Sequence, residues 1–153
     1  MKKYGLIFLV IGLVTFLLFY ISTLYSPGSY ADAETYELSI GESDLILIIQ
    51  KFKEENPQYK VPDQVGLSDG KGGPQDHWYH IYFYYPKEDQ IIYFWTRSNG
   101  KQNTTLAFVA VNNSLVLGNW KDINKDFSYS ENKSQIEKFE NRILRNIKEK
   151  INH

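Results

Sequence analysis

The sequence predicts an α+β domain that follows a single N-terminal membrane-spanning helix. Two runs of aromatic and β-branched residues flank a short polar loop within residues 77–97, which indicates a β-hairpin. Apolar residues recur at helical spacing on both sides of this hairpin, at 43–56 and 134–151. An uncharged apolar run occupies residues 5–24. The expected order is strand, helix, four-strand antiparallel meander and helix, with both helices packed on one face of the sheet.

The two runs of the hairpin separate into two faces, because successive side chains of a strand point to opposite sides. One face takes side chains without polar atoms, namely Ile81, Phe83, Ile92 and Phe94. The other takes side chains that mostly combine an apolar body with a polar tip, namely Trp78, His80, Tyr82, Tyr84, Tyr93, Trp95 and Arg97. The first face suits a core. The second suits a partly exposed surface, so its residues are the candidate binding residues.

The N-terminus predicts how the domain is held in place. The apolar run of residues 5–24 has about the 20 residues that a helix needs to cross a bilayer. Lys2 and Lys3 precede it and favour a cytoplasmic N-terminus. We therefore expect a signal anchor at residues 1–25, a linker at 26–34 and an extracytoplasmic domain at 35–153. The protein is then a single-pass protein of the cell membrane.

Two alternatives to the anchor remain open. Residues 31–33 have the small-x-small form of a signal-peptidase site, and cleavage there makes the domain secreted. This site lies well past the apolar run, which is itself long for a cleaved signal. A buried helix of a soluble core is disfavoured, because the run has no polar face.

The first elements of the domain follow from spacing and from breakers. Alternation over residues 36–40 predicts a short strand. Apolar spacing then predicts a helix over 43–56, which ends there because Pro57 disfavours helical geometry at the preceding residue. Residues 45–49 alone could instead form a buried strand. The glycine- and proline-containing stretch 59–75 predicts a long loop, which is a candidate binding lid.

The remaining elements complete the meander and add a helix. Residues 104–111 predict a third strand, with Leu106, Phe108 and Ala110 on the core face. Residues 115–120 predict a fourth strand. The segment 134–151 begins with a capping-box pattern and continues as an amphipathic helix. A basic membrane-surface helix is its alternative, which the interspersed acidic residues disfavour.

Composition excludes several classes of function. The whole chain has 17 Lys and Arg against 18 Asp and Glu. The part from Ala33 onward loses Lys2, Lys3 and Asp32 and has 15 against 17, so the basic surplus of a nucleic-acid-binding domain is missing. The chain has no cysteine, which excludes disulfides, thiolate metal sites and a cysteine nucleophile.

No sequence motif predicts a cofactor or a metal. Residues 66–71 resemble a phosphate-binding loop but are one residue short, and a strand rather than a helix follows. Asp122, Asn124 and Asp126 resemble the start of a calcium loop, yet Phe127 and Lys133 replace the required glycine and glutamate. His77 and His80 are expected on opposite faces of a strand, where they are poorly placed to share a metal.

The Tyr- and Trp-rich face is therefore the candidate binding surface. Such side chains are enriched where proteins bind partners. We expect a non-catalytic interaction module with a protein or glycan partner. The alternative is a small cell-envelope enzyme whose site lies between the 59–75 loop and the sheet, and a buried carboxylate close to His80 in a cleft favours it. In a third reading, the rings only stabilise the hairpin, or the loop covers them.

Overall fold

The structure is a computed structural model that describes residues 12–17 and 30–152, and the chain divides into two compact units, Met1–Ala31 and Asp32–His153. In the first unit, residues 12–17 are helical. Among the described residues, no helix has the length and apolar character that crossing a membrane requires. Most of the predicted anchor, residues 1–25, lies outside the described residues, so it stays a prediction.

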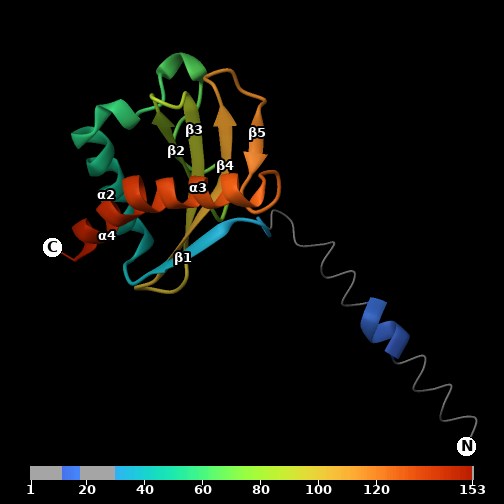
Figure 1. Cartoon of the computed structure of the whole chain (residues 1–153). Helices are drawn as coiled ribbons and strands as arrows, with labels where there is room; N and C mark the ends of the chain where they lie inside the picture. Colours follow the sequence, from blue (N-terminus) through green and yellow to red (C-terminus); the bar gives the residue numbers. More distant parts are fainter. Residues whose placement is uncertain (1–11, 18–29, 153) are drawn as a thin grey trace, which may run out of the picture. The chain divides into compact units, whose positions relative to one another are not determined.

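The second unit is an antiparallel sheet with helices, which confirms the predicted α+β class (Figure 1). Its strands are β1 (Glu34–Leu38), β2 (Tyr79–Tyr85), β3 (Gln90–Ser98), β4 (Thr104–Asn113) and β5 (Trp120–Asp122). Its helices are α2 (Glu42–Glu55), α3 (Tyr129–Phe139) and α4 (Arg145–Ile151), with a π turn, η3 (Glu140–Leu144), between the last two. Two short 3₁₀ turns, η1 (Pro57–Tyr59) and η2 (Asp63–Val65), follow α2. The segment 45–49 is thus helical and not a strand.

Strand β4 organises the sheet, whose order is β1-β4-β3-β2. One edge of β4 pairs with β3 along its whole length. The other edge pairs with β1 over Thr104–Phe108 and with β5 over Ala110–Asn112. Strands β2 to β5 therefore form the predicted meander, and β1 completes the sheet beside β4.

The fourth strand of the meander lies later than predicted. Residues 115–119 form a loop, and the strand is Trp120–Asp122 instead of 115–120. The Asn112 side chain explains the difference. Its amide nitrogen donates to the carbonyls of Ser114 (2.7 Å) and Val116 (3.0 Å), and its oxygen accepts from the Asn119 N–H (2.8 Å). These bonds wrap the loop around one side chain and keep its backbone out of the sheet.

A β-bulge in β4 changes which residues face the core. Tyr93 pairs with Ala110 and Phe94 pairs with Phe108, so Val109 is an extra residue in β4. Beyond the bulge the alternation shifts by one position. Val111, rather than Ala110, belongs to the hydrophobic core, and the predicted core position of Ala110 is wrong.

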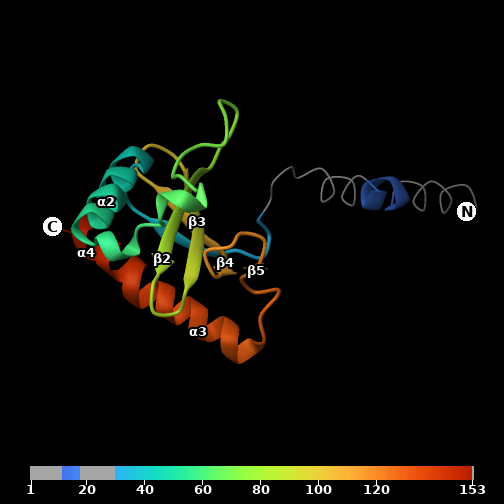
Figure 2. The same cartoon turned by 90° about the horizontal axis from the view of Figure 1, so that it is seen from above.

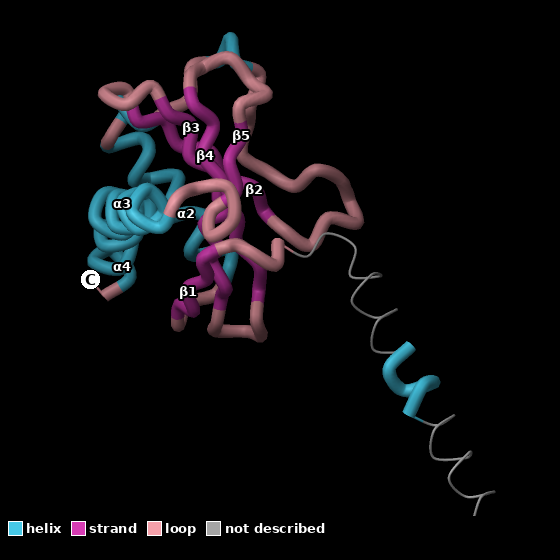
Figure 3. Tube along the Cα trace, turned by 45° about the vertical axis from the view of Figure 1, so that its right-hand side comes forward, coloured by secondary structure: helices cyan, strands magenta, loops and turns pink. Residues whose placement is uncertain are grey.

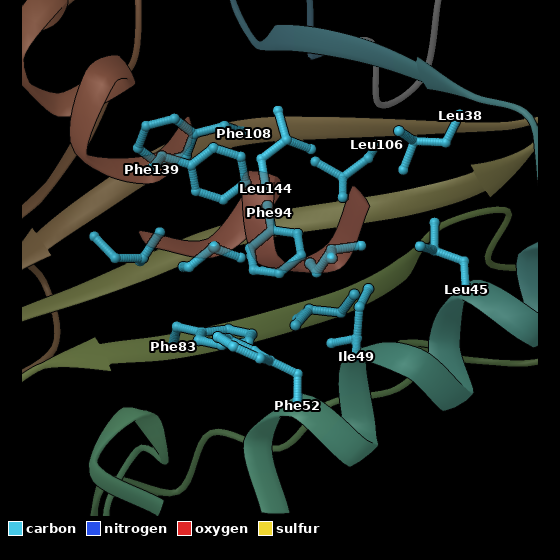
Figure 4. Packing of buried hydrophobic residues seen from close by; sticks show 14 of the residues in the cluster. Leu38, Leu45, Ile49, Phe52, Phe83, Phe94, Leu106, Phe108, Phe139 and Leu144 are labelled. Carbon is cyan, nitrogen blue, oxygen red and sulfur yellow. The ribbon is translucent and has the colours of Figure 1, made fainter. Parts of the chain in front are cut away.

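The core lies between the helices and the apolar side of the hairpin. The predicted core face is confirmed, since Ile81, Phe83, Ile92 and Phe94 are all fully buried in the main hydrophobic cluster. Figure 2 shows α3 on one side of the sheet and the loop that leads into β2 on the other. Phe139 of α3 is central to the packing: its ring stacks on Phe108 at 4.5 Å between centroids and meets Phe94 edge-on at 5.3 Å (Figure 4).

The C-terminal helix starts earlier than predicted and contains a wider turn. It begins at Tyr129, because Ser128 and Glu131 form a capping box. This capping box lies upstream of the one predicted at residue 134, and in it the Ser128 N–H donates to the Glu131 carboxylate at 3.1 Å. Its core residues Phe139, Ile143 and Ile147 recur every four residues, more than the 3.6 residues of an α-helical turn. The π turn η3 absorbs this excess and keeps all three side chains on the sheet.

We expect Phe139→Ala to lower the free energy of unfolding by about 3–5 kcal/mol, because it leaves a cavity between the rings of Phe94, Phe108 and Tyr36, the last of which stacks on Phe139 at 6.0 Å between centroids. Urea denaturation followed by circular dichroism measures this. The control is Tyr129→Ala, since Tyr129 is 87% exposed at the start of the same helix. A loss at Phe139 no larger than the loss at Tyr129 contradicts the assigned core.

Candidate functional site

The predicted binding residues lie together on the side of the sheet that points away from α3. We call this side, with Trp78, His80, Tyr82, Tyr84, Tyr93, Trp95 and Arg97, the aromatic face. In the register of β2 and β3, His80 lies opposite Trp95 and Tyr82 lies opposite Tyr93. The Tyr82 N–H points away from β3, toward Asp69, so Tyr82 and Tyr93 form a non-hydrogen-bonded pair, in which side chains approach closely.

The centre of the aromatic face is a row of three stacked rings. Tyr93 stacks on Tyr82 with centroids 5.2 Å apart and an interplanar angle of 19°, and on His80 with centroids 5.7 Å apart and an angle of 29°. We call His80, Tyr93 and Tyr82 the ring row. Each of the three side chains is half-buried, so much of its ring surface is covered by its neighbours.

The other predicted residues lie at the two ends of the ring row. At one end, Trp78 and Trp95 have ring centroids 6.0 Å apart, and the exposed Arg97 guanidinium lies 5.9 Å from the Trp78 ring. Trp95 is only 7% exposed, so the prediction of a partly exposed position is wrong for this residue. At the other end, the Tyr84 hydroxyl donates to Asp89 in the hairpin turn at 2.9 Å, and this bond raises the pKa of Tyr84.

Trp120 of β5 belongs to the aromatic face, although the sequence analysis did not assign it there. Its ring lies 6.0 Å from Tyr93 and 6.4 Å from Tyr82 between centroids. The bulge at Val109 makes this contact possible, because it places the small side chain of Ala110 between the ring row and β5. Ile91, Ala107 and Ala110 share this face and are buried as well, so the rings form a second packed layer.

A chain of hydrogen bonds runs from Asp76 through His80 to Tyr93. His80 Nε2 lies 2.8 Å from Asp76 Oδ2, and His80 Nδ1 lies 2.7 Å from the Tyr93 hydroxyl. The backbone N–H groups of Trp78 (3.0 Å) and Gly72 (2.9 Å) donate to the same carboxylate. The Trp78 N–H is the largest of the effects that lower the pKa of Asp76 from 3.8 to about 2. Asp76 is therefore ionised at neutral pH.

The loop before β2 is fixed along the open edge of that strand (Figure 3). Gly70 and His80 exchange two backbone hydrogen bonds of 2.8 and 2.9 Å. Asp69 accepts from the Tyr82 N–H at 3.0 Å and from the Lys53 ammonium at 2.5 Å. Burial lowers the pKa of Lys53, and the charge of Asp69 opposes that shift. The loop thus caps an edge strand that would otherwise present unpaired backbone groups.

Two segments of the sequence resemble or approach metal sites, the pair His77 and His80 and the calcium-like segment 122–133. The described residues contain no group of three or more His, Asp or Glu side chains placed to hold a metal ion. The calcium-like segment forms a turn instead. Asp126 accepts from the Asp122 N–H at 2.9 Å, and the Asn124 oxygen accepts from the Asn132 amide at 2.6 Å. Asp122 itself pairs with Lys125 at 3.0 Å. These oxygens serve as turn-forming groups.

A cavity of about 640 Å³ lies between α2 and α4. Its lining includes Ile48, Phe52, Asn146 and the ion pair of Lys150 with Glu55. None of these residues belongs to the aromatic face. This cavity therefore does not provide the cleft beside His80 that the enzyme alternative expects.

The comparisons with known proteins give no relative for this chain. No family model matches it, and neither the curated proteins nor the solved structures yield a match.

We expect Asp69→Ala to destabilise the fold by about 2–4 kcal/mol, because it removes the acceptor of the Tyr82 N–H and the charge partner of the half-buried Lys53 ammonium, which keeps only the Tyr82 carbonyl as an acceptor. Chemical denaturation measures the difference. The matched control is Glu55→Gln, which removes the exposed pair with Lys150 and should change stability little. Equal effects of the two substitutions contradict the assignment of Asp69 as the residue that fixes the loop.

We expect the stability difference between the wild type and Asp76→Asn to shrink as the pH falls from about 5 to 2. The folded-state pKa of Asp76 lies below its ordinary value of 3.8, at about 2. Its carboxylate therefore stabilises the fold above pH 3.8, and this contribution is lost as Asp76 takes up a proton. Urea titrations of both proteins across this range provide the test. A difference that stays constant with pH rules out an ionised, hydrogen-bonded Asp76.

Proposed function

We propose that this protein is a recognition module of the cell envelope and that its aromatic face binds a partner protein. The apolar sequence of residues 5–24 supports a membrane anchor, and the lysines before it support a cytoplasmic N-terminus. The domain would then lie outside the membrane, attached through one pass.

One observation carries this proposal: the side of the sheet away from α3 is covered by mutually packed aromatic rings with polar tips. The ring row and Trp120 pack together, and the pair of Trp78 and the buried Trp95 lies at one end of the ring row. Tyrosine and tryptophan offer large contact areas at low cost in side-chain entropy, and they dominate binding energy at protein interfaces. The packing also holds the rings in place before a partner arrives.

The stacking favours a protein over a glycan. Sugar rings bind aromatic side chains by stacking on their flat ring faces. In the ring row these faces already pack against each other, since Tyr93 has His80 and Tyr82 as stacked neighbours. The Arg97 guanidinium lies over the ring of Trp78. Ring edges, hydroxyls and a guanidinium suit the mixed polar and apolar surface of a protein.

A second candidate function, a small cell-envelope enzyme, is favoured by the hydrogen-bonded chain of Asp76, His80 and Tyr93. A carboxylate that orients a histidine, which in turn contacts a hydroxyl, is the arrangement that activates hydroxyl nucleophiles. These three hydrogen-bonded residues lie where the loop before β2 meets strands β2 and β3.

Site-specific photo-crosslinking in the native membranes tests the recognition function. A photoreactive amino acid at Gln75, an exposed position beside the aromatic face, should give a discrete adduct with a partner protein. The combined substitutions Trp78→Ala and Arg97→Glu should reduce this adduct by on the order of tenfold, the size of effect that a central interface aromatic residue has. Trp95 is left intact, because it is buried.

The control places the same photoreactive group at Tyr129, which is highly exposed on α3. The recognition function is wrong if position 129 gives the same adduct. It is equally wrong if the adduct from position 75 persists in the double variant while that variant keeps the wild-type circular dichroism spectrum and melting temperature.

A further inference from the structure

We propose that Tyr93 is a nucleophile, activated by His80 and Asp76, that accepts an acyl group from an uncharged ester or thioester. This inference rests on the second candidate function and is independent of whether the aromatic face also binds a protein. It is carried by the geometry of three side chains from two adjacent strands and the loop that precedes them.

The direction of the two hydrogen bonds follows from Asp76. An ionised carboxylate only accepts hydrogen bonds, so the nitrogen of His80 that faces it, Nε2, must carry a proton. In neutral imidazole the other nitrogen, Nδ1, then has a lone pair and accepts from the Tyr93 hydroxyl at 2.7 Å. The Tyr93 O–H therefore points at a base.

Asp76 is itself held in position. The Trp78 and Gly72 N–H groups both donate to its carboxylate, and a Cβ atom at position 72 would come within 2.8 Å of Asp76 Oδ2. A glycine at position 72 therefore allows the backbone to approach the carboxylate. Asp76, His80 and Tyr93 thus have the roles of orienting acid, base and hydroxyl that nucleophilic catalysis requires.

In the proposed step, Tyr93 Oη attacks the carbonyl carbon and its proton moves to His80 Nδ1. The tetrahedral adduct then collapses, the bond from carbon to the leaving oxygen or sulfur breaks, and the alcohol or thiol leaves with the proton from the imidazolium. The acyl group remains on Tyr93 as a phenyl ester. Asp76 stays ionised throughout and stabilises the imidazolium through Nε2–H.

The surroundings of Tyr93 favour an uncharged acyl donor. The rings of Tyr82 and Trp120 both lie next to the Tyr93 ring and contact each other, and the carboxylate of Asp76 behind His80 is negatively charged. A phosphoryl group would meet repulsion from this carboxylate, and phosphoryl transfer depends on cations to neutralise the developing charge. A carbonyl compound with an apolar acyl chain fits aromatic walls better.

Benzenesulfonyl fluoride tests the nucleophile directly on the purified full chain in detergent. Tyr93 Oη displaces fluoride from sulfur, and peptide mapping by mass spectrometry gives the labelling rate of each tyrosine. We expect half-buried Tyr93 to react about tenfold faster than its stacked neighbour Tyr82 and faster than exposed Tyr129. His80→Gln and Asp76→Asn should each slow Tyr93 by about tenfold or more, the usual contribution of a positioned base.

The proposal is overturned if Tyr93 reacts no faster than Tyr129, or if the His80→Gln protein, folded by circular dichroism, labels Tyr93 at the wild-type rate. A second measurement needs no substitution: ¹⁵N NMR of the wild type should show that the neutral His80 imidazole carries its proton on Nε2 and has a lone pair on Nδ1. A neutral His80 with its proton on Nδ1 would falsify the proposed base. Both experiments use the chain without a partner, so their outcome is separate from that of the crosslinking.

Discussion

The aromatic face depends on one structural constraint, the close pairing of side chains at non-hydrogen-bonded positions of β2 and β3. This pairing sets Tyr82 against Tyr93, and His80 against Trp95. Because neighbouring pairs lie along the same two strands, the rings also meet diagonally, and His80 stacks on Tyr93. The ring row, the contact of His80 with the Tyr93 hydroxyl and the platform for Trp120 all follow from this register. A slip of one residue would exchange the aromatic face for the core face.

The same alternation produces two packed layers from one hairpin. Phe83 and Phe94 are buried under the helices, while the ring row is half-buried on the other side. Each aromatic pair contributes about 0.5–1.5 kcal/mol beyond its buried area, so the ring row stabilises the hairpin whether or not a ligand binds. The loop before β2 adds a lateral constraint, because Asp69 ties it to α2 through Lys53 and Asp76 ties it to the aromatic face. A stable, prearranged surface is what both proposed functions require.

The sequence predicted what local periodicity determines. The two faces of the hairpin, the helical stretch after β1 and the amphipathic C-terminal helix all show a period of two or 3.6 residues. It did not reveal the bulge at Val109, because an extra backbone residue leaves the apolar character of residues 104–111 unchanged. The contact of Trp120 depends on that bulge and on the small Ala110, so it could not be predicted either.

The position of Asp76 was missed for a different reason. On a regular strand, three extended residues would separate Asp76 from His80. The structure instead bends the chain at Gly72–Asp76 and pairs Gly70 with His80, so the carboxylate returns to the imidazole. Asp69, just before this bend, is held by Lys53, which is distant in the sequence. A capping pattern at Ser128 could have been found, since Ser128 and Glu131 show the same spacing as the predicted cap at 134.

His80 joins the stabilising and the chemical roles of this surface in one side chain. It holds the loop through Asp76, stacks in the ring row and lies within hydrogen-bond distance of the Tyr93 hydroxyl. A histidine that served only as a structural link could use either tautomer, provided that each ring nitrogen found a partner. The ionised Asp76 removes that freedom and leaves the lone pair on the nitrogen that faces Tyr93. Trp120 packs on the rings of Tyr93 and Tyr82, so a partner bound over Trp120 would act on Tyr93 through packing, while Asp76 would still orient His80.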